Sequence, residues 1–414
     1  MRDDSAITDM ASGGLSAAPQ TPESAPPTVA FVLTLGLLMA FGPMAIDMYL
    51  PAMPAMAEAF GAPQAAVQST LSAFLLAFGL SQLAWGPLGD RFGRKPTAMA
   101  GIALFVAGSL GCAFAEGVGG LTAWRVVQAL GAGAAPVMAR AMVRDRYERD
   151  RAASLLSLLI LVMGVAPLVA PLLGGQVLLH AGWPAVFLVL AAFGAVALLC
   201  LLPFGETLPA GTRRGLDPAS LVEGYAALLR DRRFLGYCLS AAFPFAGMFA
   251  FISGSPFVFI QHFGVSPQLF GLVFAVNVVG MLGVSTLNSR LVLRHGADRL
   301  LRIGTLLSAA AGFVLLGAGL AGAGGLWGIL APLLLFTATI GLVAANATAS
   351  AMQAFPRMAG TASALTGTLQ LGLGAVAGML VGVFADGTPL PMTAVIAGAG
   401  LLGLAANRLL VRGA

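Results

Sequence analysis

Two ionisable residues, Asp47 and Arg125, lie well inside long apolar stretches of this sequence. If these stretches span a membrane, each charge is costly there and is by default a candidate functional group. The first stretch ends near Pro51 and the second begins near residue 119, so both side chains should lie on the order of 6 to 10 Å below one membrane surface. At this shared depth the two side chains could meet or be linked through water, so small movements could change the protonation of Asp47. The alternative is a static ion pair that only ties two helices together.

A cluster of charges and glycines follows the second apolar stretch and reads G-P-L-G-D-R-F-G-R-K-P from Gly86 to Pro96. An aspartate can bind the free N–H groups at a helix N-terminus, and we expect Asp90 to do so where a later stretch begins near Gly360. Gly86 and Gly93 should permit the close approach of a neighbouring element. The candidate functional residues of this cluster are Gly86, Asp90, Arg91, Gly93, Arg94 and Lys95. The alternative is a basic loop that only orients the chain.

Two prolines one helical turn apart, Pro167 and Pro171, are followed by Gly174 and Gly175. Each proline removes a backbone hydrogen bond, so a helix through this segment should bend where the glycines allow tight packing. The alternative is a bend that has no functional role.

Polar and aromatic side chains scattered through the apolar stretches are candidates for lining a central cavity. Buried polar groups need hydrogen-bond partners, which favours an interior orientation over contact with lipid. The candidates are Tyr49, Phe78, Gln128, Phe251, Asn277, Asn346 and Gln370. Phe74, Phe245, Met248 and Phe249 also suit an adaptable apolar cavity, although packing or lipid contact explains most positions of this kind. For Gln128, a hydrogen bond between helices is an equally good explanation.

The composition places these residues in a membrane protein. Only 9% of the 414 residues are charged and 58% are hydrophobic, whereas a soluble domain carries about 25% charged residues. A span needs about 20 apolar residues, and twelve stretches are long enough. They are 29–53, 66–88, 97–116, 119–142, 153–177, 184–204, 234–261, 267–289, 299–321, 325–353, 359–384 and 390–411. The sequence predicts an all-α membrane protein with twelve transmembrane helices.

The longest polar connection, 205–233, divides the stretches six plus six. We predict a disordered tail over 1–28, an N-terminal six-helix bundle over 29–204, a linker over 205–233 and a C-terminal bundle over 234–414. Of the 22 lysines and arginines, 21 fall on one side of this map. By the positive-inside rule, both termini and the linker should be cytoplasmic. Two parallel halves with a substrate site between them are a common plan for secondary transporters.

The sequence lacks the residues that several other functions would require. The cysteines are odd in number and lie in apolar stretches, which predicts no disulfide framework, and the three histidines have no cluster of metal ligands beside them. The phosphate-binding motif G-x-x-x-x-G-K-[ST] is absent, which disfavours a nucleotide-driven pump. A membrane aspartyl protease would need a second intramembrane carboxylate beside Asp47. We expect no metal, cofactor or nucleic-acid partner, and an ion gradient or the substrate's own gradient as the energy source.

Four segments resemble a known family. The loop at 86–96 resembles the signature G-x-L-x-D-R-x-G-R-K of the major facilitator superfamily. This resemblance implies that the candidate residues of the loop form a conformational latch without substrate contact. The segment that begins at Arg125 is similar to the R-x-x-Q-G motif of this superfamily, with Ala129 in place of the glycine. The segment 170–175 is similar to the G-P-x-x-G-G element of its antiporters, with Ala170 in place of the first glycine. The stretch D-M-Y-L-P-A-M-P at 47–54 resembles the Bcr/CflA subfamily of drug:proton antiporters. This resemblance suggests that Asp47 carries the proton and that Arg125 tunes its protonation.

This resemblance implies two pseudo-symmetric six-helix bundles of the major facilitator fold. It also implies a proton-coupled multidrug or antibiotic efflux antiporter of the bacterial inner membrane that works by alternating access. Its partners would be small amphipathic molecules, protons and the lipid bilayer. The resemblance does not determine the oligomeric state, for which we expect a monomer. The alternative is an exporter or importer of one small metabolite on the same scaffold. A membrane-embedded enzyme is the weaker alternative.

Overall fold

The computed structural model describes residues 27–208, 218–354 and 359–411, and every regular element in these ranges is a helix. The first half contains α1 (Val29–Met39), α2 (Phe41–Asp47), η1 (Leu50–Ala52), α3 (Met53–Ala59), α4 (Gln64–Phe92), α5 (Arg94–Ala113), α6 (Val118–Ala132), α7 (Ala134–Arg146) and α8 (Arg149–Leu201). The second half contains α9 (Pro218–Arg230), α10 (Arg232–Ser255), η3 (Pro256–His262), α11 (Pro267–His295), α12 (Ala297–Ala321), α13 (Gly325–Ala354), α14 (Ala359–Val383), α15 (Leu390–Ala406) and η5 (Asn407–Val411). The predicted tail, 1–28, falls outside the described residues except for 27 and 28.

Ten helical segments of the described chain are long and apolar enough to cross a membrane, or eleven if the bent pair formed by α1 and the helices after it is one span. This count takes α8 once, although its 53 residues are about 80 Å long, more than twice the hydrocarbon core of a bilayer. Gly182 interrupts α8 with a φ of 75°, which only glycine adopts easily. Dividing α8 at Gly182 gives the twelve spans predicted from the sequence.

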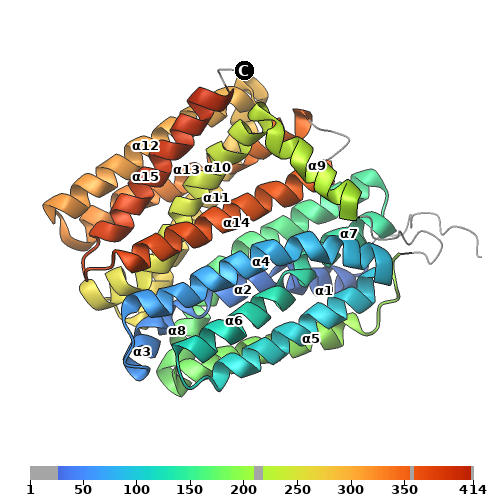
Figure 1. Cartoon of the computed structure of the whole chain (residues 1–414), viewed down its shortest axis with the longest axis horizontal. Helices are drawn as coiled ribbons and strands as arrows, with labels where there is room; N and C mark the ends of the chain where they lie inside the picture. The colour runs from blue at the N-terminus through green and yellow to red at the C-terminus, as the bar shows by residue number, and fades with distance from the viewer. Residues whose placement is uncertain (1–26, 209–217, 355–358, 412–414) are drawn as a thin grey trace, which may run out of the picture.

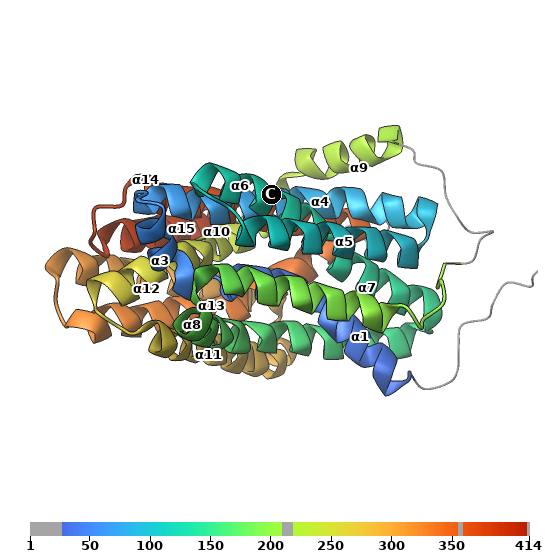
Figure 2. The same ribbon diagram turned by 90° about the horizontal axis from the view of Figure 1, so that it is seen from below.

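The helices form two bundles that follow the order of the chain. The helices α1 to α8 occupy the lower half of Figure 1, and α10 to α15 occupy the upper half. The bundles meet along two seams, where α4 packs against α14 and α8 packs against α11. The predicted linker contains a helix that sequence analysis did not anticipate, α9, which lies on the outside of the bundle in Figure 2 and contacts α10 and α14.

The first span is broken just before Pro43, which cannot continue a regular helix. The helix α1 and the segment Phe41–Ala59, which begins with α2, meet at Ala40 with a bend of 42°. Pro43, in the first turn of α2, has no N–H to donate to the carbonyl group of Met39, and its ring clashes with that carbonyl in a continuous helix. The bend places the end of α2, with Asp47, at the interface between the two bundles.

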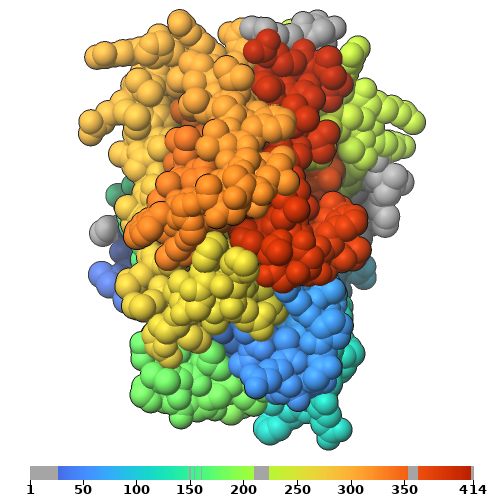
Figure 3. Space-filling view, turned by 90° about the vertical axis from the view of Figure 1, so that its left-hand side faces the viewer, coloured from blue at the N-terminus to red at the C-terminus, as the bar shows by residue number. Residues whose placement is uncertain are grey.

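The two ends of the bundle differ in charge. The α4–α5 and α7–α8 connections and α9 lie at one end, on the right in Figure 2, where Arg91, Arg94 and Arg144 lie; we call it the basic end. The helix α3 lies at the opposite end, which we call the far end. Figure 3 faces the far end and shows the yellow segment of the second half lying directly on the blue segment of the first half.

Candidate functional site

A cavity of about 340 Å³ lies between the two bundles. This volume falls in the range of small-molecule sites, about 300–1,000 Å³. Its walls come from α1, α2, α4, α7 and α8 on one side and from α10, α11, α13 and α14 on the other. Most of the lining is apolar and includes Met39, Ile46, Phe78, Met163, Phe245, Met248, Phe249, Phe251, Phe274 and Met281. Flexible methionines and aromatic rings suit ligands of varied shape.

Asp47 is the acidic residue in this lining. It is the last residue of α2, and only 4% of its surface is exposed. Within the described part of the chain, no hydrogen bond or ion pair joins its carboxylate to another side chain. The predicted partner Arg125 therefore makes no ion pair with Asp47 in this conformation. A buried carboxylate that faces a cavity and has no fixed partner can exchange a proton with whatever enters that cavity.

Arg125 lies behind the cavity wall, fully buried in α6. Its Nη1 donates to the carbonyl oxygen of Ala45 at 2.9 Å and to Oε1 of Gln128 at 2.6 Å. The guanidinium carbon is 4.4 Å from the ring centroid of Tyr49 and 4.2 Å from that of Phe74, distances typical of cation–π contacts. Arg125 therefore holds the backbone of α2 two residues before Asp47, and so positions the carboxylate without binding it.

Four of the seven predicted cavity residues, Phe78, Phe251, Asn277 and Gln370, line the cavity. Asn277 also accepts a hydrogen bond from the Thr337 hydroxyl at 3.0 Å, and Thr337 belongs to the same lining. These residues place polar groups on the wall formed by the second half, opposite Asp47.

The other three predicted cavity residues are not part of this lining. The Tyr49 hydroxyl lies 3.0 Å from the hydroxyl of Thr70, and Gln128 donates to Ser109 at 2.8 Å. Asn346 donates to Oδ1 of Asn288 at 2.8 Å. Each group is satisfied by a neighbouring helix, so the alternative of a helix–helix hydrogen bond describes Gln128 in this conformation.

Sequence analysis missed three polar residues of the lining: Gln82 of α4, Arg140 of α7 and Thr337 of α13. Nη2 of Arg140 donates to Oε1 of Gln82 at 3.4 Å. Arg140 lies two residues before the end of the predicted fourth span, 119–142, where it counts among the basic residues of one membrane side. Its apolar neighbours Met142 and Val143 were the signal for a position still inside the span.

The cavity is closed at the far end by contacts between the halves. Nε2 of Gln68 in α4 donates to the carbonyl oxygen of Ser253 in α10 at 3.0 Å. A Cβ on Gly175 would lie 2.6 Å from the carbonyl oxygen of Pro267, so glycine lets α8 approach the start of α11. On the opposite side of the cavity the Arg140 side chain is exposed. This conformation is therefore closed at the far end, with an exposed polar side chain toward the basic end.

The predicted glycine packing on α8 is present at both positions, because a Cβ on Gly174 would overlap the carbonyl oxygen of Met48. The helix α8 continues through Pro167 and Pro171, and the non-helical residue that the structure gives inside it is Gly182. Pro167 itself lines the cavity. The bend at the two prolines stays a prediction.

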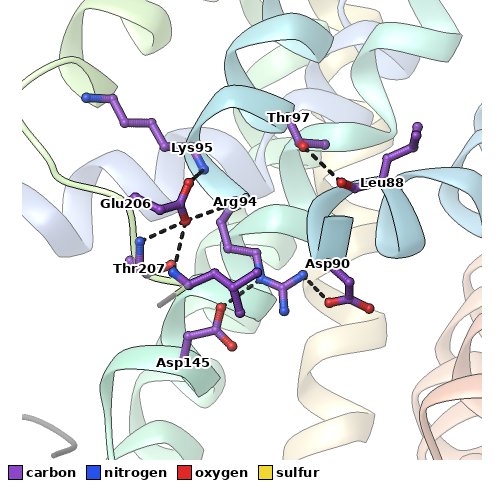
Figure 4. Close-up of polar contacts among 9 residues, drawn as sticks. Leu88, Asp90, Arg94, Lys95, Thr97, Asp145, Glu206 and Thr207 are labelled. Carbon is purple, nitrogen blue, oxygen red and sulfur yellow. Dashed lines mark hydrogen bonds and ion pairs between the residues drawn. The ribbon is translucent and has the colours of Figure 1, made fainter. Parts of the chain in front are cut away.

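Three of the predicted latch residues, Asp90, Arg94 and Lys95, belong to a polar network at the basic end (Figure 4). The fourth charged latch residue, Arg91, is exposed and contacts the ring of Phe92. Arg94 makes an ion pair with Asp90, and its Nε donates to Oδ2 of Asp145 at 2.7 Å. Glu206 accepts hydrogen bonds from the backbone N–H groups of Arg94 at 2.9 Å and Lys95 at 3.1 Å, and so caps α5. The network therefore ties the α4–α5 connection to the ends of α7 and α8.

The latch glycines have roles other than those predicted. Gly93 connects α4 and α5 with a φ of 102°, a left-handed conformation that favours glycine. A Cβ on Gly86 would meet no atom within 4 Å, so the expected close approach does not occur there. It occurs at Gly89, where a Cβ would lie 2.7 Å from the side chain of Met138.

The predicted contact of Asp90 with the eleventh span stays a prediction. That span, α14, begins directly after residues 355–358, which lie outside the described residues, as does the side-chain packing around Gly360. In the described part of the chain Asp90 pairs with Arg94 within its own half, and 47% of its side chain is exposed.

Comparison with known proteins gives consistent matches over most of the chain. The family model of the Major Facilitator Superfamily matches residues 35–379. The chain is 35% identical over 366 residues to the "Bicyclomycin resistance protein homolog" of Haemophilus influenzae, a match that covers 88% of this chain and 92% of that protein. It is 32% identical over 355 residues to "Multidrug resistance protein D" of Escherichia coli, covering 85% and 88%.

Among solved structures, the chain resembles the xylose transporter XylE from E. coli in a partially occluded, inward-open conformation. The TM-score is 0.73 at 15% sequence identity, and the match covers 92% of this chain and 97% of that one. At this identity the likeness concerns the fold alone.

Proposed function

The chain belongs to the major facilitator superfamily, and from that premise we propose that it exports small amphipathic, drug-like molecules in exchange for protons. The prediction that the chain belongs to this superfamily, and to its Bcr/CflA drug-efflux branch, is confirmed. The chain is a multi-pass membrane transporter and not an enzyme, so the alternative of a membrane-embedded enzyme is excluded. Relatives named for bicyclomycin and multidrug resistance support the substrate class.

The observation that carries the proposal is the position of Asp47 on the wall of an otherwise apolar cavity. A proton on Asp47 removes a charge that the cavity solvates poorly, and a polar or cationic group of a substrate can take the place of that proton. Binding of proton and substrate would then exclude each other at one carboxylate. This competition is what an antiporter requires, with the proton gradient as the energy source and no cofactor.

In this proposal Arg125 is a positioning residue. Its hydrogen bond to the carbonyl oxygen of Ala45 fixes the last turn of α2. Its Nε and Nη2 have no hydrogen-bond partner in the described structure and face the rings of Tyr49 and Phe74. Donors of this kind can bind Asp47 in another state of the cycle, so Arg125 would tune the carboxylate by exchanging partners.

We propose that the basic end faces the cytoplasm of a bacterial inner membrane, because arginine-rich connections stay on that side. The conformation described, closed at the far end, would then be inward-facing. The bundles 29–204 and 234–414 would rock against each other about the cavity, with the segment 205–233 joining them. The network around Arg94 would act as the latch that controls this movement.

The test is growth of a pump-deficient bacterial host across a panel of antibiotics. Expression of the native chain should raise resistance to several unrelated compounds, and Asp47→Asn should abolish the gain. The matched control is Glu58→Gln, which neutralises an exposed acid on α3. Resistance to none of the compounds, or full resistance with Asp47→Asn at equal expression, would contradict the proposal. Protection against a single compound would favour the alternative of one specific substrate.

A further inference from the structure

The cavity lining contains two charged side chains of opposite sign within the described structure, Asp47 and Arg140. The proton-coupled mechanism uses Asp47 and leaves Arg140 without a role. The Arg140 side chain is exposed on the cavity side of α7. Its one described hydrogen bond is the 3.4 Å contact with Gln82, which is long for a charged donor. Its remaining donors are therefore available to a ligand.

The two charges lie at opposite ends of the cavity. Arg125 contacts α2 at Ala45, which marks the level of Asp47 along the bundle. Arg140 follows Arg125 by fifteen residues on α6 and α7, a rise of about 22 Å along the helices. Even after the lengths of the side chains are subtracted, the two groups are too far apart to form an ion pair. An elongated molecule can reach both.

The surfaces between the two charges are suited to an apolar ring system. Phe78 of α4 and Phe251 and Met248 of α10 line this region. Neutral polar groups, Gln370 and the hydrogen-bonded pair of Asn277 and Thr337, lie on the wall of the second half. Along the cavity, a ligand would therefore meet the Asp47 carboxylate, then apolar side chains, and then the Arg140 guanidinium.

We propose that Arg140 determines substrate specificity by binding a carboxylate, or a similarly acceptor-rich group, at the end of the substrate opposite Asp47. This inference rests on the proposed export function and narrows its substrate class. The cavity then favours elongated molecules of zero net charge, with an amine near Asp47 and a carboxylate near Arg140, over monocations built on the same scaffold.

The test uses two probes that differ only in the group that Arg140 would bind: a zwitterionic fluoroquinolone carboxylic acid and its methyl ester. Both keep the aromatic rings and the amine. Binding to the purified full-length protein in lipid nanodiscs should be about tenfold tighter for the acid, the value expected for a hydrogen bond to a charged group. Arg140→Gln should remove this preference, while Arg140→Lys should keep most of it. The matched control, Arg144→Gln, removes an exposed charge one turn further along α7 and should leave the preference intact.

Each other outcome contradicts the inference. Equal or tighter binding of the ester by the native protein overturns the role of Arg140 and leaves the export function untouched. Equal losses of preference with Arg140→Gln and Arg144→Gln would assign the effect to the general charge of the basic end. Loss of the preference with Arg140→Lys, in a variant that still binds the ester normally, would also exclude simple charge recognition. Binding of neither probe by the native protein would overturn the proposed substrate class as well.

Discussion

Replacing Arg94 with glutamine should lower the free energy of unfolding by about 2–4 kcal/mol. The side chain is 9% exposed and bridges two carboxylates. The hydrogen bond to Asp145, whose side chain is 17% exposed, should contribute about 1.5–3 kcal/mol because both groups are charged and largely buried. Asp90 is 47% exposed, so solvent screens its ion pair, which should contribute at most about 1 kcal/mol. Most of the loss should therefore come from the pair with Asp145.

A double-mutant cycle separates the two contributions. The free energy of unfolding would be measured by chemical denaturation in detergent micelles for Arg94→Gln, Asp145→Asn and the double variant, and then for the same set with Asp90→Asn. The coupling energy should be about 1.5–3 kcal/mol with Asp145 and below about 1 kcal/mol with Asp90. Arg91→Gln is the control, because Arg91 is exposed and has a single described contact, with the ring of Phe92 at 5.3 Å.

Two results would refute this reasoning. A coupling energy below about 0.5 kcal/mol between Arg94 and Asp145 would mean that the hydrogen bond does not hold the network together. An equally large loss with Arg91→Gln would mean that the total charge of the loop matters, and not the particular contacts of Arg94.

Two further substitutions test the latch and the packing of α8. Asp90→Asn should slow transport and leave substrate affinity unchanged, because Asp90 lies at the basic end and outside the cavity lining; lost affinity with normal cycling would disprove the latch. Gly174→Val should lower the free energy of unfolding by about 1–3 kcal/mol or more, because its Cβ would overlap the carbonyl oxygen of Met48. Gly372→Val is the control, since a Cβ there meets no atom within 4 Å; a similar loss in both variants would contradict the packing argument.

Hydropathy alone predicted the spans, because a lipid-facing helix must be apolar along its whole length. The exceptions have local causes. The fifth and sixth spans are joined in α8, and the turn between them depends on one glycine, Gly182, which no apolar pattern distinguishes from the other glycines. The linker helix α9 was missed because its 13 residues mix apolar and polar side chains and are too few to cross a membrane, although its buried Leu228 packs against Phe234.

The residue types in the sequence identified members of the candidate site, but they did not reveal which groups these residues contact. The cost of a charge in a membrane singled out Asp47 and Arg125, and both are buried at the interface of α2 and α6. The membrane depth estimated from the sequence could not distinguish an ion pair with Asp47 from the hydrogen bond that Arg125 makes to the Ala45 carbonyl group. The Asp47 carboxylate and the Ala45 carbonyl lie at nearly the same depth. Arg140 was missed because a basic residue near the end of a span is normally explained by the adjoining cytoplasmic loop.

The most direct test of the central claim, that Asp47 couples substrate to protons, is substrate-induced proton movement in reconstituted vesicles. The folded native protein and Asp47→Asn would be compared with a pH-sensitive dye in the lumen, before and after addition of a compound that the native chain exports. The native protein should move protons when the compound is added and should export it uphill along an imposed pH gradient, and Asp47→Asn should do neither. Unchanged proton flux and uphill export by the folded Asp47→Asn variant would contradict the mechanism.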